Sequence, residues 1–472
     1  TGAFKSYVVG LGWYDEDFNT KYEVFEDTSY NSNDTRSCIV KFLDWLNDNA
    51  EAFDEYKIYA HNGGRFDWNL FLSEGLSNNP HWKIEADKVI ELNGCYINIP
   101  LKNKHKCIKL ELRDSYRILS EKLDDLTQEY NVEHKKLTGE IDFNTITFHN
   151  WFQQREDVLR YLYNDVIGLL EVLTVFSEEV YNGFEGINIT QQFTSATLAK
   201  SHWFLNCYDS VKYPIFNLSK EVDSYITPSY YGGRCECFYL GDVSKTIKPN
   251  GIYYMDYTSL YPAMMMNEIP YGQPTFYGFE GLTNKDKINK IKLFERNRWC
   301  FVRCMVKSIK KNKKPIHSMK DEMGRLVFRH YDTPTEMTLN GCELLLGLKE
   351  GIYEYEILDA YVFYKAKYFK KAVKMLFERK AKAKREGNSC LAKICKIVVN
   401  SLYGFWCFNR YDRQGVRFYE KDDFNRLLKD FQDNKILEWK ELGEYLVARI
   451  NDDVNMDTCN KAIASAITSL AR

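Results

Sequence analysis

One octapeptide narrows the choice of fold more than any other segment of the chain: Met255-Asp256-Tyr257-Thr258-Ser259-Leu260-Tyr261-Pro262. The apolar run before it, residues 251–255, predicts a buried strand that ends at Asp256. A carboxylate at the end of a buried strand is well placed to hold a metal ion. The backbone amides of residues 258–260 are expected at a helix start, where they can face a triphosphate. The alternative, a simple strand-to-helix cap by Ser259 or Asp256, is less favoured because the run is long and specific.

A second run has helical periodicity: Lys396-Ile397-Val398-Val399-Asn400-Ser401-Leu402-Tyr403-Gly404. Lys396, Asn400 and Tyr403 fall on one helical face, which presents a cation for phosphate, an amide and an aromatic ring. Gly404 permits a helix end. An amphipathic surface helix is the alternative, again disfavoured by the length of the run. A basic helix over residues 379–385, ending at Gly387, precedes it and predicts a positively charged pair of helices.

The segment His61-Asn62-Gly63-Gly64-Arg65-Phe66-Asp67 follows a predicted strand, residues 57–60. In this segment Asn62 can hydrogen-bond a ligand, Phe66 offers a face for stacking a base, and Asp67 offers an oxygen to a hard cation. A turn with a buried Phe and a helix-capping Asp is the alternative, and the segment by itself favours that alternative.

Tyr161 and Asp165 lie four residues apart within a predicted helix, residues 157–175, so they share one face. A phenol that orients a water molecule beside a metal-bound carboxylate is a sensible nuclease arrangement. The alternative is an exposed Asp beside a packed Tyr, and this pair alone is a weak indication.

The composition sets wider limits. The 472 residues carry 64 Lys and Arg against 66 Asp and Glu, a net charge of −2 that argues only weakly against a nucleic-acid partner, because local patches set the surface field. No stretch approaches the roughly 18 apolar residues of a membrane helix. The thirteen Cys form no CxxC pair, which indicates reduced, intracellular thiols. The 34 Tyr and 29 Phe could form core or a stacking surface.

Together these runs resemble the motifs of family B DNA polymerases, in the family's order. The runs at Asp256 and Lys396 resemble Dx2SLYP and Kx3NSxYG, and those at Asn62 and Tyr161 resemble the exonuclease motifs Nx2-3(F/Y)D and Yx3D. Tyr230-Tyr231-Gly232-Gly233 resembles the YxGG motif between the two modules. The compact size and the insertion at residues 262–366 resemble the protein-primed branch of bacteriophages and linear plasmids.

The resemblance implies roles in templated nucleotidyl transfer. Asp256 would bind the catalytic metals, and Ser259 and Leu260 would hold the triphosphate. Tyr261 would lie under the sugar and exclude a 2′-hydroxyl. Lys396 and Lys384 would contact the triphosphate. The base pair and template would be contacted by Asn400, Tyr403 and Gly404, and DNA by Tyr230, Gly232 and Gly233.

The resemblance also implies a 3′–5′ exonuclease. Its metal ligands would be Asp67 and Asp165, Tyr161 would orient the attacking water, and Asn62 and Phe66 would grip the primer end. Ser115 resembles a residue of a single-strand ligand motif, in which the family usually has Leu where Tyr116 stands. The family often has a catalytic Lys where Thr138 stands, and Lys136 is close by.

The implied fold is a multidomain α/β and α+β protein: a ribonuclease H-like exonuclease domain, a family B palm with insertions and two-helix fingers, with the thumb missing. The predicted domains begin with the exonuclease at residues 1–190, the first part of the palm at 191–265 and an insertion like the terminal-protein region at 266–365. They continue with the fingers at 366–405, a second insertion at 406–448 and a truncated palm at 449–472. The implied cofactor is Mg²⁺, two per active site, with Mn²⁺ as a substitute. The implied partners are template–primer DNA, dNTPs and a terminal protein as primer, with no membrane.

Two expected motifs are missing from the sequence. The exonuclease motif DxE belongs on the strand before Thr1, and Asp15-Glu16-Asp17 sits in a turn after that strand. The polymerase motif DTD is mimicked by Asp457-Thr458-Cys459, whose Cys stands where the second Asp must be. The chain is therefore expected to be a fragment that is inactive alone. The alternatives are a catalytically dead nucleic-acid-binding remnant and, less favoured, an exonuclease-only enzyme. The expected location is a host cytoplasm or, for a linear plasmid, a mitochondrion.

Overall fold

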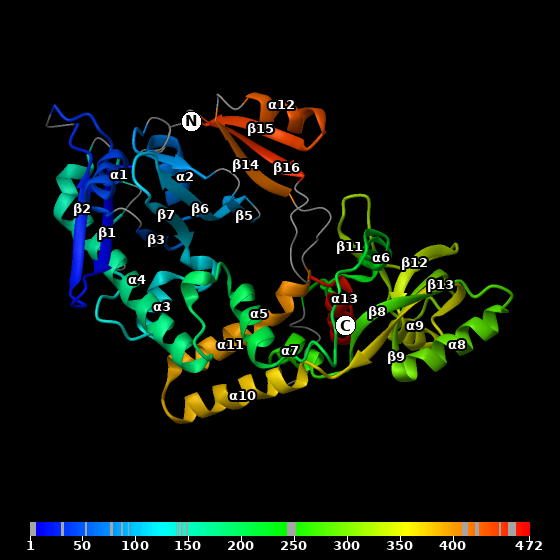
Figure 1. The fold of residues 1–472 in the computed structure, drawn as a ribbon. Coiled ribbons are helices and arrows are strands. Elements are labelled where there is room, and N and C mark those ends of the chain that lie inside the picture. Colours follow the sequence, from blue (N-terminus) through cyan, green and yellow to red (C-terminus); the bar gives the residue numbers. More distant parts are fainter. Residues whose placement is uncertain are drawn as a thin grey trace. The chain divides into compact units, whose positions relative to one another are not determined.

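The chain folds into two compact units, each assembled from segments far apart in the sequence (Figure 1). Unit 1 combines residues 1–198, 380–394 and 412–454, and unit 2 combines residues 199–379, 395–411 and 455–472. The computed structural model describes residues 6–29, 33–51, 54–75, 79–85, 88–92, 94–137, 139, 141–142, 145–147, 150–242, 252–407, 414–420, 424–442, 445–451 and 459–472. The six predicted domain boundaries remain predictions.

The first part of unit 1 is mixed α/β. Its elements are β1 (Val8–Tyr14), β2 (Thr20–Glu26), α1 (Cys38–Asn49), β3 (Glu55–Ala60), α2 (Asp67–Leu70), β4 (Trp82–Ile84), β5 (Ile90–Leu92), β6 (Cys95–Asn103), β7 (Lys109–Asp114), α3 (Leu123–Glu129) and α4 (Arg155–Gly183). One sheet has the order β3-β7-β6-β4, with β5 beside β6, and β3 runs parallel to β7. Strands β1 and β2 form a separate antiparallel hairpin. The strand predicted at residues 57–60 and the helix predicted at 157–175 are confirmed.

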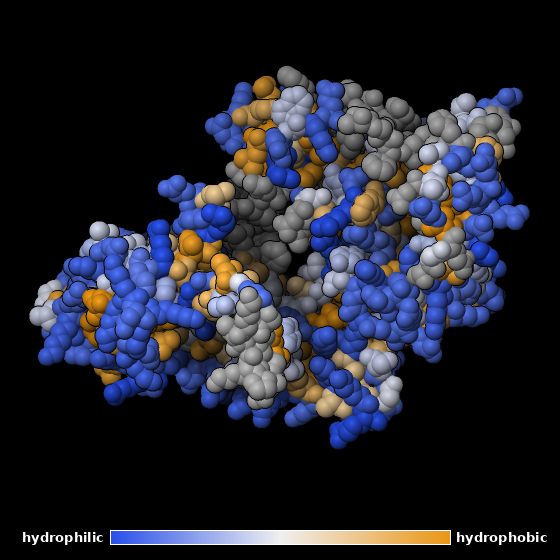
Figure 2. Space-filling model, turned by 180° about the vertical axis from the view of Figure 1, so that it is seen from behind, coloured by the Kyte–Doolittle hydropathy of each residue, from blue (hydrophilic) through white to orange (hydrophobic). Residues whose placement is uncertain are grey.

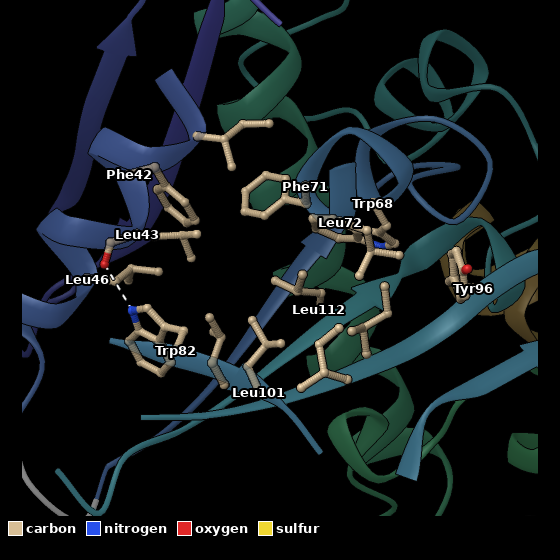
Figure 3. Packing of buried hydrophobic residues seen from close by; sticks show 14 of the residues in the cluster. Phe42, Leu43, Leu46, Trp68, Phe71, Leu72, Trp82, Tyr96, Leu101 and Leu112 are labelled. Carbon is tan, nitrogen blue, oxygen red and sulfur yellow. Dashed lines mark hydrogen bonds between the residues drawn. The ribbon is translucent and has the colours of Figure 1, made fainter. Parts of the chain in front are cut away.

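Helix α1 shows how the core of unit 1 is built. Its buried residues Ile39, Phe42, Leu43 and Leu46 recur at helical spacing on one face. The helix begins where the Ser37 side chain accepts a hydrogen bond from the Val40 amide, at 3.3 Å. Figure 3 shows this face packed against Phe71, Leu72 and strand residues, with the Trp82 indole N–H donating to the Leu43 carbonyl at 3.0 Å.

A late segment of the chain completes the same core. Strands β14 (Gln414–Glu420), β15 (Ile436–Leu442) and β16 (Tyr445–Asn451) form a sheet of order β14-β16-β15, and α12 (Phe424–Gln432) lies between the first two in sequence. Phe418, Tyr445 and Val447 belong to the core cluster around α1. The Tyr445 hydroxyl accepts a hydrogen bond from the Ile84 amide at 3.2 Å. Residues 412–448 of the predicted second insertion therefore belong to unit 1.

Unit 2 is built around an antiparallel sheet of order β12-β9-β13-β8. Its elements are α5 (Ser195–Asn206, which begins in unit 1), α6 (Lys220–Ile226), α7 (Leu260–Met265), β8 (Ile269–Tyr277), α8 (Asn284–Asn297), β9 (Arg298–Ser308), β10 (Ser318–Lys320), β11 (Leu326–Phe328), β12 (Thr335–Asn340), α9 (Gly341–Glu350), β13 (Tyr353–Ala366) and α13 (Lys461–Ala471). One core cluster joins this sheet to α8 and α9, and another joins it to α6 and α13. The sheet is therefore covered on both faces.

The many Lys and Arg between residues 285 and 314 predict an exposed segment, but β9 within it is mostly buried. Cys300 and Val302 point into one core cluster, while Trp299 and Phe301 point into the other. Alternate side chains of a strand face opposite sides, so an apolar run buried on both faces forms the centre of a sheet. The many Lys and Arg on either side of this run hid its strand pattern.

Helices α10 (Lys370–Arg385) and α11 (Ser389–Gly404) confirm the predicted helical pair, with Gly387 in the turn at a φ of +75°. Residues 389–407 are long and apolar enough to cross a membrane by length and composition, contrary to the sequence-based expectation. Helix α11 buries Val398 and Leu402 inside the protein and carries Lys396 on its exposed face. These features fit a core helix.

The strand predicted to end at Asp256 is not formed. Residues 252–257 lie in irregular backbone, and Tyr254 and Met255 are 94% and 88% exposed. A strand needs a hydrogen-bonded neighbour, and the described residues supply none for this segment. The prediction failed because an apolar run shows only the capacity to form a strand.

Most of the aromatic side chains are core. The largest fully buried side chains include Trp82, Trp151, Trp203 and Trp406. Hydrophilic side chains cover most of the face drawn in Figure 2, and apolar ones form smaller patches. None of the thirteen cysteines forms a disulfide bond, as the sequence predicted.

We expect Gly64→Ala to destabilise unit 1 by about 1–3 kcal/mol, because a β-carbon there would lie 2.0 Å from the Tyr96 carbonyl oxygen, in the backbone of β6. Gly232→Ala is the matched control, since its β-carbon would meet no atom within 4 Å. Calorimetric unfolding of both variants checks this. Equal melting temperatures would show that the close approach at Gly64 is not a constraint.

Candidate functional sites

A polar cavity of about 590 Å³ opens in unit 1. Its walls come from the turn after β3, the segments on either side of α3, and α4. The lining residues are His61, Asn62, Arg65, Tyr116, Lys122, Leu123, Asp124, Lys136 and Asp165. Two of the residues predicted from sequence, Asn62 and Asp165, therefore meet in one cavity although about 100 residues separate them.

The turn after β3 is held by a buried carboxylate. Asp114, at the end of β7, is 2% exposed and accepts a hydrogen bond from the Gly64 amide at 3.3 Å. Burial raises the pKa of Asp114, while hydrogen bonds from backbone amides and the charge of Arg117 oppose that rise. Asn62 has a left-handed backbone, with a φ of +64°, which Asn tolerates better than most residues. The turn thus presents Asn62 to the cavity.

His61 connects this turn to the segment before α3. Its Nε2–H donates to the Glu121 carbonyl at 2.7 Å, and its Nδ1 accepts from the Ser115 hydroxyl at 3.1 Å. Burial lowers the pKa of His61, which favours this neutral form. Ser115 is fully buried, and its hydroxyl supports a wall of the cavity. The DNA contact predicted for its side chain stays a prediction.

Lys136 brings two predicted residues of α4 together. Its ammonium lies 2.5 Å from an Asp165 carboxylate oxygen and 4.5 Å from the centre of the Tyr161 ring. Burial raises the pKa of Asp165, and the Lys136 charge opposes that rise. Burial alone would lower the pKa of Lys136, but its hydrogen bonds to Asp165 and Tyr161 outweigh burial and raise it. Lys136 thus holds the Asp165 carboxylate beside the Tyr161 ring.

The backbone near Lys136 is anchored to α4. The His134 amide and its Nδ1 donate to the two carboxylate oxygens of Glu171, at 3.0 and 2.7 Å. A β-carbon at Gly168 would lie 2.4 Å from the His134 carbonyl oxygen, so the two backbones touch. These contacts fix the backbone position from which the Lys136 side chain extends.

One carboxylate of the cavity, Asp165, has an oxygen that can bind a hard cation. The second carboxylate oxygen of Asp165 is buried and has no hydrogen-bond partner among the described residues, so it can take a ligand. Asp67, the first residue of α2, is exposed and does not line the cavity. Phe66 is 64% exposed, which leaves its ring free to stack.

A second constellation in unit 2 joins three motifs that lie far apart in sequence. Tyr261, in α7, stacks on Tyr403, in the last turn of α11, with ring centres 4.4 Å apart and an angle of 16°. The hydroxyls of Tyr403 and Tyr230 share a hydrogen bond at 3.0 Å. Burial raises the pKa of Tyr403 to about 12, so its phenol keeps its proton at neutral pH.

Packing among the described residues does not explain the glycines near this tyrosine cluster. A β-carbon at Gly232, Gly233 or Gly404 would meet no described atom within 4 Å. None of the three has a positive φ. Glycine at such positions fits the close approach of a ligand to the backbone.

The exposed face of α11 is arranged as its spacing predicts. Lys396 and Asn400 are exposed and Tyr403 is half-buried. Helix α7 begins at Leu260, after Ser259 in a left-handed conformation with a φ of +53°. Asp256 is exposed in irregular backbone, and Lys384 is exposed near the end of α10.

Sequence reasoning missed His61 and Asp114 as supports of the cavity and left Lys136 without a role. Their partners lie 29 to 60 residues away, so no local spacing marks these contacts. Thr138, Asp457 and Thr458 lie outside the described residues.

Residues 52–155 and 139–445 match the family described as "DNA polymerase type B, organellar and viral". A probable DNA polymerase of Agaricus bitorquis is 25% identical over 457 residues, covering 87% of this chain and 53% of that protein. The DNA-directed DNA polymerase of Enterobacteria phage PRD1 is 29% identical over 230 residues, covering 49% of this chain and 33% of that protein. The chain thus spans about half the length of its first relative.

The fold is similar to that of phi29 DNA polymerase. In a complex with primer–template DNA and incoming nucleotides, that enzyme aligns with 95% of this chain and 70% of its own, at a TM-score of 0.61 and 17% identity. A binary complex with primer–template DNA gives a TM-score of 0.63 at 18% identity, covering 98% of this chain and 74% of its own. The predicted multidomain α/β fold class is confirmed by this likeness.

We expect Tyr230→Phe and Tyr403→Phe each to lower the free energy of unfolding by about 1 kcal/mol, because each removes the same hydrogen bond. The double variant should then cost little more than either single one. Urea unfolding of the four proteins measures this coupling, with exposed Tyr254→Phe as the control. Fully additive losses would show that the two hydroxyls do not interact.

Proposed function

The chain belongs to the type B DNA polymerases of organelles and viruses, and from that membership we propose that its protein catalyses DNA-directed DNA synthesis with 3′–5′ proofreading. The observation that carries the proposal is the tyrosine cluster of unit 2. Tyr261, Tyr403 and Tyr230 come from three motifs that resemble the family's nucleotide and DNA motifs, and Tyr403 contacts both of the others.

In the proposed synthesis, the 3′-hydroxyl oxygen of the primer attacks the α-phosphorus of a dNTP, and pyrophosphate leaves. Lys396 neutralises triphosphate charge, with Lys384 as a second cation. The Tyr261 ring lies under the sugar and excludes a 2′-hydroxyl. Tyr403 and Asn400 meet the nascent base pair, and Gly232, Gly233 and Gly404 allow DNA to approach the backbone.

In the proposed proofreading, the unit 1 cavity receives the primer end. Asn62 and Phe66 grip the last nucleotides by hydrogen bonding and stacking. Tyr161 orients the attacking water. Lys136, which touches both Tyr161 and Asp165, holds their geometry and adds a positive charge beside the scissile phosphate.

Asp256 would hold metal ions in the polymerase site, and Asp165 with Asp67 in the exonuclease site. The free, buried oxygen of Asp165 supports this assignment. When bound, two Mg²⁺ ions, or Mn²⁺ in their place, stabilise the charge on the attacking and leaving oxygens.

Protein priming is part of the proposal. The phage PRD1 relative and the segment inserted between the motifs at Asp256 and Lys396 support a polymerase whose first primer is a hydroxyl of a terminal protein. The thirteen cysteines without a disulfide bond support a reducing compartment, so we propose a host cytoplasm or, for a linear plasmid, a mitochondrion as the location.

We expect reciprocal losses in the whole polymerase. Asp256→Asn should lower primer extension about a thousandfold and leave excision intact, because losing a metal ligand costs several kcal/mol of transition-state stabilisation. Asp165→Asn should lower primer excision by a similar factor and leave extension intact. Extension and excision assays on one labelled primer–template measure both. A wild-type protein that binds DNA but performs neither reaction would favour the catalytically dead, DNA-binding remnant.

We expect residues 1–472, expressed alone, to perform neither reaction at a measurable rate. The DxE and DTD carboxylates that complete the two metal sites of the family are not in this sequence. The control is the same assay on the product of the uninterrupted reading frame. Robust extension by the 472-residue segment would contradict the proposed need for a further carboxylate.

A further inference from the structure

The tip of the α10–α11 helical pair belongs to unit 1, although the rest of both helices does not. At this tip the Lys393 side chain is 11% exposed and forms ion pairs with both Glu121, just before α3, and Glu129, the last residue of α3. Two carboxylates around one ammonium make the tip a docking point. We call these three residues the latch.

Neighbouring contacts place the tip on the same surface. The Asn388 side chain donates to a Glu179 carboxylate oxygen at 2.9 Å, near the end of α4. The Ser389 hydroxyl donates to the Glu129 carbonyl at 3.5 Å. A β-carbon at Gly183 would lie 3.1 Å from the Leu391 side chain. The latch is therefore part of a specific interface.

The latch is also joined to the unit 1 cavity. The Glu121 carbonyl accepts the His61 Nε2–H bond that supports the turn carrying Asn62. The three residues after Glu121, namely Lys122, Leu123 and Asp124, line the cavity. A cation that holds the Glu121 side chain thus holds one wall of the proposed exonuclease site.

The same helix leads to the proposed nucleotide site. Helix α11 runs without a break from Ser389 to Gly404, so Lys393 and Lys396 lie one turn apart on a single rigid element. A displacement of α11 when Lys396 engages a triphosphate would move Lys393 as well.

The exposure of the latch carboxylates allows the Lys393 ammonium to dissociate from them. The Glu121 and Glu129 side chains are 40% and 48% exposed, so water can solvate both carboxylates when the ammonium leaves. Partly exposed ion pairs have small net stability, which suits an equilibrium that a ligand can shift.

We propose that Lys393, Glu121 and Glu129 couple the position of the fingers helices to the proofreading cavity. With the tip docked, the latch holds the wall at residues 121–124 in place for excision. Nucleotide binding at Lys396 opposes docking and so favours synthesis. This inference rests on the proposed function, and Lys393 acts in it as a positioning residue.

The test uses the whole polymerase with Lys393→Met, Lys393→Glu and the charge-swapped pair Glu121→Lys/Lys393→Glu. Lys382→Met is the matched control, since Lys382 is 69% exposed on α10 and pairs only loosely, at 3.8 Å, with Glu386. Two quantities are measured: the rate of primer excision without nucleotide, and the dNTP concentration that halves excision on a matched primer–template.

We expect Lys393→Glu to slow excision about fivefold or more and to lower the half-suppressing dNTP concentration by a similar factor. Lys393→Met should show smaller shifts in the same directions, and the charge-swapped pair should return both quantities toward wild type. A merely structural defect in the cavity would slow excision without changing the dNTP concentration. If Lys393→Glu misfolds, the Met variant and the charge-swapped pair provide the test.

Both Lys393 variants behaving like Lys382→Met would overturn the latch, as would slower excision with an unchanged dNTP dependence. Failure of the proposed function is a different result, because the wild-type enzyme would then neither extend nor excise.

Discussion

The structure depends on the continuity of one helix. Helix α11 contributes its first residues to unit 1 and its later ones to unit 2, with no break between Ser389 and Gly404. The apolar side of the helix, including Val398 and Leu402, is buried, while its polar side carries Lys393, Lys396 and Asn400. A hydrogen-bonded helix resists bending, so a displacement of α11 at Lys396 also displaces Lys393. This constraint gives a physical link between two sites with separate chemistry.

In unit 1, both the cavity and the latch contain a lysine paired with carboxylates. Lys136 holds Asp165 and Tyr161 in the cavity, and Lys393 holds Glu121 and Glu129 at the docking surface. The exposures differ, and so do the consequences. Asp165 is half-buried, and one of its oxygens has no hydrogen-bond partner in the described part of the chain, which suits a ligand site. The carboxylates of Glu121 and Glu129 are more exposed to solvent, which suits a reversible contact. A net charge of −2 conceals this local pairing.

Local patterns predicted the elements well where one stretch of chain contains the whole signal. The spacing of Lys396, Asn400 and Tyr403 placed them on one helical face, and the structure agrees. The pattern failed where a partner was needed. Residues 252–256 have a strand-like composition but no paired neighbour in the described chain, and β9 hid a buried strand inside a basic segment.

The sequence alone determined the motifs, their order and the helical faces that carry Tyr161, Asp165, Lys396 and Tyr403, because these depend on spacing within a few residues. Tertiary structure decided which motifs meet. It set the Tyr261 ring on Tyr403, bonded Tyr403 to Tyr230, and brought Lys136 to Asp165 and Lys393 to Glu121. Such contacts join residues tens to hundreds of positions apart. Their geometry follows from how whole cores pack, and no local pattern contains that information.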